Sequence, residues 1–203
     1  MNKNIYNPFN KIAGVQALGI GLTAIIIISI IAHFSGVTFP SIISAQTGTN
    51  AMSIPRLLVQ NLGHWIIFST IIYLFGVFAS KSHIRAIDIF GTIAVSRIPF
   101  ILFSFLGFLP IDGITQKISA AVKTNPADPN LLSDVPLSEI SILIVFALLT
   151  LAIAVWVIAL MYNAFRISSN IKGEKSAILF IVAIILSSIF SYFYEIMIVR
   201  LIP

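Results

Sequence analysis

The chain consists mainly of long apolar segments separated by short polar ones. A helix needs about 20 predominantly apolar residues to cross the hydrocarbon core of a bilayer. Five segments meet this requirement, so the pattern predicts an all-α polytopic membrane protein: a bundle of five transmembrane helices forming one membrane domain over residues 1–203. The predicted spans cover about 12–33, 57–80, 86–109, 140–165 and 176–202.

Composition supports the same class of protein. Hydrophobic residues make up 58% of the chain and charged residues 9%, against about 25% charged residues in an average soluble domain. The mean hydropathy is +1.04. These values exclude an ordinary soluble domain, a disordered chain and a mostly polar binding module. Cysteine is absent, which excludes disulfides, thiolate metal sites and cysteine nucleophiles.

The basic residues predict how the bundle is oriented. The net charge of +5 comes from scattered residues rather than from a basic run, so we expect contact with lipid and no nucleic-acid binding. Cytoplasmic loops of membrane proteins carry an excess of lysine and arginine. An N-in/C-out arrangement puts seven basic residues inside (Lys3, Lys11, Lys81, Arg85, Arg166, Lys172, Lys175) and four outside (Arg56, Lys117, Lys123, Arg200). The sequence therefore favours N-in/C-out.

The two outer connections are longer than the inner ones. We interpret residues 34–56 as a loop, with Ser53 as N-cap and Pro55 in the first turn of the next helix. In the second outer connection, Ile114, Ile118 and Val122 recur at a spacing of four residues. This spacing is typical of a short helix lying along the headgroups, but an irregular loop with a few apolar residues is equally compatible.

Three ionisable residues fall within the predicted spans and are candidates for function, because charges inside a membrane are costly. Asp88 lies just inside the third span, and Arg85 three positions earlier shares its helix face. The pair is either a proton or cation site or an interfacial ion pair that sets the depth of the helix. We favour the ion pair, since such surface pairs are common.

Arg97 lies deeper than Asp88. Its position places it roughly 16 Å from the inner edge at 1.5 Å per residue, near the midplane. Pro99 follows two positions later and removes a helical hydrogen bond, which frees the carbonyl of Val95. We interpret Arg97 as an internal structural clamp on freed carbonyls; the alternative is a substrate or anion site.

Glu195 is the third candidate, near the end of the fifth span. It is either the ion-pair partner of Arg97, which two extended side chains would just reach, or a carboxylate at the outer headgroup level beside Tyr192 and Tyr194. The sequence leaves both alternatives open.

No pattern of catalytic or metal-binding residues is recognisable. The three histidines are isolated in sequence, and the chain lacks a nucleophile elbow, a phosphate-binding loop and paired carboxylates. We therefore expect neither an enzyme nor a cofactor or metal.

The segment from Trp65 to Leu102 resembles the prokaryotic branch of the Yip-domain family (Ypt-interacting proteins). The similar features are Trp65, Gly76, the Lys81–Ser82 turn, Arg85-x-x-Asp88-x-x-Gly91 and the segment from Ala94 to Pro99; Asn7-Pro8-Phe9 is also similar to the usual start of the family. The resemblance implies five spans with a cytoplasmic N-terminus, and for this branch no established activity. The D-L-Y-G-P motif of eukaryotic members, which are linked to Rab-type GTPases, is absent.

These observations predict a non-enzymatic protein that binds or organises other membrane components, with another membrane protein or a second copy of the chain as partner. The alternative is a small transporter or channel subunit that uses Arg97 near the midplane. The expected location is the bacterial inner membrane.

Overall fold

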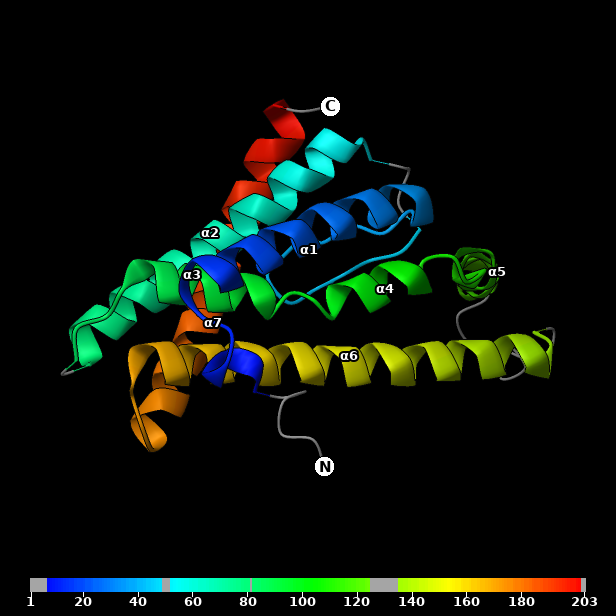
Figure 1. The fold of residues 1–203 in the computed structure, drawn as a ribbon. Helices are drawn as coiled ribbons and strands as arrows, with labels where there is room; N and C mark the ends of the chain where they lie inside the picture. The colour runs from blue at the N-terminus through cyan, green and yellow to red at the C-terminus, as the bar shows by residue number, and fades with distance from the viewer. Residues whose placement is uncertain (1–6, 49–51, 81, 125–134, 202–203) are drawn as a thin grey trace.

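The computed structural model describes residues 7–48, 52–80, 82–124 and 135–201. Five of its helices are long and apolar enough to cross a membrane, and the described residues include no strand, so the predicted all-α membrane bundle is confirmed (Figure 1). The elements are η1 (Pro8–Asn10), α1 (Gly14–Ser35), α2 (Ile54–Ala79), α3 (Ala86–Val95), α4 (Phe100–Leu106), α5 (Ile111–Thr124), α6 (Leu137–Ser169) and α7 (Glu174–Leu201).

The observed spans differ from the predicted ones by a few residues at their ends. The second helix begins at Ile54 instead of 57, with Ser53 at the N-cap position and Pro55 in the first turn as predicted. The fourth is longer than predicted and covers Leu137–Ser169. The predicted end of the fifth span at residue 202 lies outside the described residues.

The third span is two helices joined by a turn at residues 96–99. Pro99 has no N–H to donate to Val95, which is the reason a regular helix stops here. Bonds of the i→i−3 type carry the chain across the break: Arg97 N–H donates to the carbonyl of Ala94, and Ile98 N–H to that of Val95. The carbonyl that was predicted to be free for Arg97 is therefore already occupied.

Glycines allow α1 to pack closely on α3. A Cβ atom at Gly21 would overlap the side chain of Ala94 and lie 2.6 Å from its carbonyl carbon. A Cβ at Gly91 would lie 2.7 Å from the carbonyl oxygen of Gly14. Small residues at such contacts let membrane helices approach backbone to backbone.

Helix α6 extends along the length of the bundle (Figure 1). Its 33 residues correspond to about 48 Å at 1.5 Å per residue, more than the roughly 30 Å of a hydrocarbon core. Only 11% of its most apolar stretch is buried inside the fold, compared with 67% for the third span. Most of α6 therefore faces outward.

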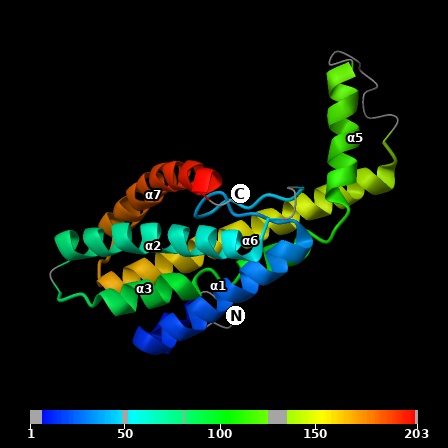
Figure 2. The same cartoon turned by 90° about the horizontal axis from the view of Figure 1, so that it is seen from above.

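Helix α5 projects away from α6 and across the direction of the long helices (Figure 2). It contains Ile114, Ile118 and Val122, so the helical alternative for this segment is the one observed. Ile114 is buried, and Lys117 Nζ lies 2.6 Å from the Glu139 carboxylate at the start of α6. The crosswise direction is the one required of a helix lying along the headgroups.

The connection between α1 and α2 folds back into the protein. Thr38 and Gln46 pair through two backbone hydrogen bonds of 2.9 Å, which closes residues 37–46 into a hairpin. Phe39 and Ile42 within this hairpin are fully buried, and Figure 2 shows the loop turning back toward the C-terminal end of α7. The segment is a loop between the two spans, as predicted; its burial inside the protein was not predicted.

Candidate functional site

Arg97 lies at the break between α3 and α4 and is 1% exposed. Its Nη2 donates a hydrogen bond of 3.0 Å to Oδ1 of Asn61 on α2, and its guanidinium carbon lies 5.1 Å from the centre of the Phe100 ring. The position agrees with the inward-facing arginine predicted from the sequence. Its partners are a side-chain amide and an aromatic face, and not the freed carbonyl that was expected.

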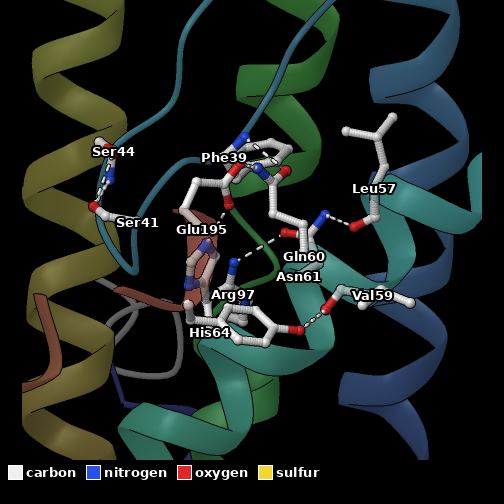
Figure 3. Close-up of polar contacts among 11 residues, drawn as sticks. Phe39, Ser41, Ser44, Leu57, Val59, Gln60, Asn61, His64, Arg97 and Glu195 are labelled. Carbon is white, nitrogen blue, oxygen red and sulfur yellow. Dashed lines mark hydrogen bonds and ion pairs between the residues drawn. The ribbon is translucent and has the colours of Figure 1, made fainter. Parts of the chain in front are cut away.

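Asn61 connects three helices. Its Nδ2 donates to the hydroxyl of Ser29 on α1 over 3.2 Å and to the carbonyl of Leu57 within α2 over 3.0 Å. Its Oδ1 accepts from Arg97. This fully buried amide therefore links α1, α2 and the broken third span by hydrogen bonds that use both of its polar atoms; Figure 3 shows its bonds to Arg97 and Leu57.

Glu195 on α7 faces α2. Its Oε1 accepts a hydrogen bond of 2.9 Å from Nε2 of Gln60, and its Oε2 lies 3.7 Å from Nε2 of His64. Among the described residues, Arg97 and Glu195 form no ion pair with each other. The first alternative, a direct ion pair with Arg97, is therefore not the one observed, and the partners of Glu195 are Gln60 and His64 on α2.

We call Gln60, Asn61, His64, Arg97 and Glu195 the polar cluster (Figure 3). Among the described residues, four of its buried polar atoms have no partner within hydrogen-bond distance: Nε of Arg97, Nδ1 of His64, and Nε2 of His64 and Oε2 of Glu195, which face each other at 3.7 Å. Polar atoms buried without a partner are destabilising and uncommon. Water molecules or a small polar ligand are the groups able to satisfy them at this depth.

The hairpin of residues 37–46 covers the polar cluster from the α1–α2 end. The backbone N–H of Phe39 donates to Oε1 of Gln60 over 3.3 Å. The Phe39 ring contacts that of Phe100 edge to face at 5.1 Å, so the ring that faces Arg97 is itself covered by the hairpin. Irregular backbone at membrane depth is tolerated where it is buried in protein, and these contacts bury it here.

Sequence reasoning missed the three residues of the cluster that belong to α2. Gln60, Asn61 and His64 occupy one face of the helix, which is the signal that was available. A span starting at about 57, as predicted, would leave His64 only about 10 Å from its start. The helix begins at Ile54, which places His64 roughly 15 Å along it.

Arg85 and Asp88 form an ion pair at the start of α3, with Nε and Oδ2 3.5 Å apart and side chains 66% and 28% exposed. The carboxylate lies in the first turn of the helix, where the helix dipole favours a negative charge. The pair is distant in sequence from the break at residues 96–99 and belongs to the end of the bundle where α3 begins.

An apolar groove runs between α4 and α6 on the outside of the bundle. It has a volume of about 840 Å³. Leu102, Phe105 and Leu106 form its α4 side, and Leu148, Leu149, Leu151, Ala152, Ile153, Val155 and Trp156 its α6 side. The groove is lined almost entirely by hydrocarbon, so its natural contents are acyl chains or the apolar face of another helix.

Residues that carry the resemblance to Yip-domain proteins occupy helix contacts. Trp65 donates from Nε1 to the carbonyl of Phe90 over 3.0 Å, which joins α2 to α3, and its indole is buried. A Cβ at Gly76 would lie 2.9 Å from Ile84. Gly91 and Ala94 make the contacts between α3 and α1 described above. Lys81 lies outside the described residues.

Comparison with models of known families, with curated proteins and with solved structures finds no match to this chain. The described residues also contain no group of three or more metal-ligating side chains.

Proposed function

We propose that this chain is a non-enzymatic membrane protein of the Yip-domain type that binds another membrane-spanning protein inside the bilayer. The observation that carries the proposal is the apolar groove between α4 and α6. It is the natural seat for a partner helix, because α6 leaves most of its apolar surface outside the fold.

The contents of the groove follow from its chemistry. Helices associate in lipid through close packing rather than through exclusion of water, so a concave surface about 840 Å³ in volume offers more contact than a flat helix face. A transmembrane helix of the partner would lie along α6. The proposed orientation is N-in/C-out in a bacterial inner membrane.

Site-specific crosslinking tests this assignment without removing native residues, because the chain has no cysteine. We expect Leu148→Cys, in the groove, to trap a defined partner in native membranes with a short thiol-directed photocrosslinker. The matched control is Ile181→Cys, on an exposed position of α7 that should trap lipid only. If both variants capture protein equally, or if neither captures any, the groove is not the surface that binds a partner.

A pull-down in mild detergent provides the second measurement. Ala152→Trp fills the groove from the α6 side, and Ile181→Trp adds the same side chain elsewhere on the lipid-facing surface. The filled groove should lose the partner that mass spectrometry identifies with the wild-type chain, while the control retains it.

A cysteine-specific reagent that cannot cross membranes would report the orientation, since His83→Cys should be protected in intact cells and Lys117→Cys should react.

A second candidate function, a transporter or channel subunit, is favoured by the polar cluster. A broken helix, an inserted hairpin and a buried arginine meet there, and such features line ion and substrate paths in membrane proteins. Reconstituted vesicles loaded with a pH-sensitive dye would report proton flux. This function requires flux through the wild-type chain that Arg97→Gln abolishes and Arg85→Gln leaves intact.

A further inference from the structure

A polar hollow lies at the end of the bundle where α2 ends and α7 begins. It measures about 360 Å³. Residues from two connections line it: Ala79, Ser80 and Ser82 where α2 ends, and Asn170, Ile171, Lys172 and Lys175 between α6 and α7. We call it the loop hollow; its polar lining consists of Ser80, Ser82, Asn170, Lys172 and Lys175.

The hydrogen bonds already made around the loop hollow leave it rich in donors. The hydroxyl of Ser80 accepts from the N–H of Ser82, and the hydroxyl of Ser82 accepts from Nδ2 of Asn170, over 3.1 Å in each case. A hydroxyl that accepts such a bond still has its own O–H to donate. Lys175 Nζ gives one hydrogen bond of 3.0 Å to the carbonyl of Ala79, and an ammonium has two further protons.

The charges at the loop hollow also favour a group that accepts hydrogen bonds and carries a negative charge. Lys172 and Lys175 are both exposed, and the neighbouring carboxylate of Glu174 is absent from the lining. Two ammonium groups and two hydroxyl donors together favour a group with several acceptor oxygens and a negative charge, as in a phosphate.

The position of the loop hollow identifies the source of that phosphate. Ala79 ends α2, Asn170 caps α6 and Glu174 begins α7, so the hollow lies at the level where three apolar helices leave the hydrocarbon. Buried Ile171 adds an apolar floor. Phospholipid headgroups occupy this level in a membrane, and basic pockets between transmembrane helices are recognised binding places for them.

From this geometry we infer that the loop hollow is a binding site for the phosphate of an anionic phospholipid headgroup. Lys172 and Lys175 supply the charge, and Ser80 and Ser82 supply hydrogen bonds to the phosphate oxygens. The site is independent of the groove between α4 and α6 and of the polar cluster, and it goes beyond the function proposed above.

The experiment measures lipid binding to the full chain in a neutral detergent, by native mass spectrometry and by thermal melting. The probes are phosphatidylglycerol, phosphatidylcholine and inorganic phosphate. We expect phosphatidylglycerol to bind and to raise the melting temperature more than phosphatidylcholine does. Lys172→Gln should weaken phosphatidylglycerol binding about fivefold, the effect of one lysine near an anionic surface, and Lys172→Arg should bind as the wild type does.

Lys123→Gln is the matched control, because it removes the same charge from exposed Lys123 on α5 and should leave binding unchanged. Lys175→Gln should also weaken binding, but it removes the hydrogen bond to the carbonyl of Ala79 as well. If Lys175→Gln unfolds for that reason, the result for Lys172→Gln decides the outcome. Equal binding of the two lipids, or equal effects of Lys172→Gln and Lys123→Gln, would overturn the inference. If inorganic phosphate binds and displaces phosphatidylglycerol at equal concentration, the ligand of the hollow is free phosphate and the inference of a lipid headgroup is overturned.

Discussion

The guanidinium of Arg97, at the break between α3 and α4, donates a hydrogen bond of 3.0 Å to the side-chain oxygen of Asn61 on α2. Both side chains are buried. The bond therefore joins an irregular segment, which lacks a regular helical ladder, to an unbroken helix. Because Asn61 also donates to Ser29 on α1, the position of the break is fixed relative to two neighbouring helices.

Replacement of this arginine should destabilise the protein. Arg97→Gln shortens the side chain and leaves Oδ1 of Asn61 buried without its donor, which costs about 1–3 kcal/mol. We expect a lower melting temperature in detergent. Arg85→Gln removes a largely exposed partner of an ion pair and should change stability by less than about 0.5 kcal/mol. An unchanged melting temperature together with lost cellular function would assign Arg97 to a ligand instead of the fold.

The contacts of Glu195 predict which residues are energetically coupled to it. A double-mutant cycle of Gln60→Leu with Glu195→Leu should give a coupling energy of about 0.5–3 kcal/mol, as is usual for residues in direct contact, since Gln60 Nε2 donates to Glu195 over 2.9 Å. Exchange of charges between Arg97 and Glu195 should recover none of the stability lost in the single variants. Chemical denaturation in detergent measures both quantities, and recovery after the exchange would mean that the two charges pair directly.

Two glycines two positions apart on α1 should respond in opposite ways to alanine. Gly21→Ala places a methyl group against Ala94 of α3 and should cost about 1–3 kcal/mol by overpacking. Gly19→Ala meets no atom of the described residues within 4 Å and should stabilise the helix by up to about 1 kcal/mol. Thermal melting of the two variants side by side is the measurement. Equal effects would show that α1 and α3 are further apart than the structure has them.

The long apolar segments were sufficient to predict the five spans, because crossing a bilayer imposes a minimum length of apolar helix that is visible in one sequence. The break at Pro99 was also foreseeable, since proline removes a backbone donor. The partner of Arg97 was not. Asn61 is 36 residues away, and its side chain reaches the arginine only because α2 packs against α3.

The burial of the hairpin of residues 37–46 could not be predicted from the sequence. The small polar residues of the hairpin are typical of a surface loop, and the apolar residues among them, including the buried Phe39 and Ile42, form no long apolar run. What places the hairpin inside the bundle is a set of contacts from distant elements, among them Gln60 on α2 and Phe100 on α4. A single sequence carries no record of such contacts.

The buried hairpin leads to a prediction about accessibility. Ile42 is fully buried and Gln46 is exposed, so a water-soluble maleimide should label Gln46→Cys in native membranes and leave Ile42→Cys unlabelled. The absence of native cysteine makes each thiol unique. Labelling in denaturant controls for reactivity, because both thiols should then react equally.

The same measurement tests the link between the hairpin and the polar cluster. Phe39→Ala removes the ring that covers Phe100, and truncation of a buried phenylalanine typically costs about 3–5 kcal/mol. In that background Ile42→Cys should become reactive, while Gln46→Cys should keep its wild-type rate. Rapid labelling of Ile42→Cys without the Phe39 substitution would mean that the hairpin leaves the bundle readily, which would favour a gated path to Arg97 over a fixed structural plug.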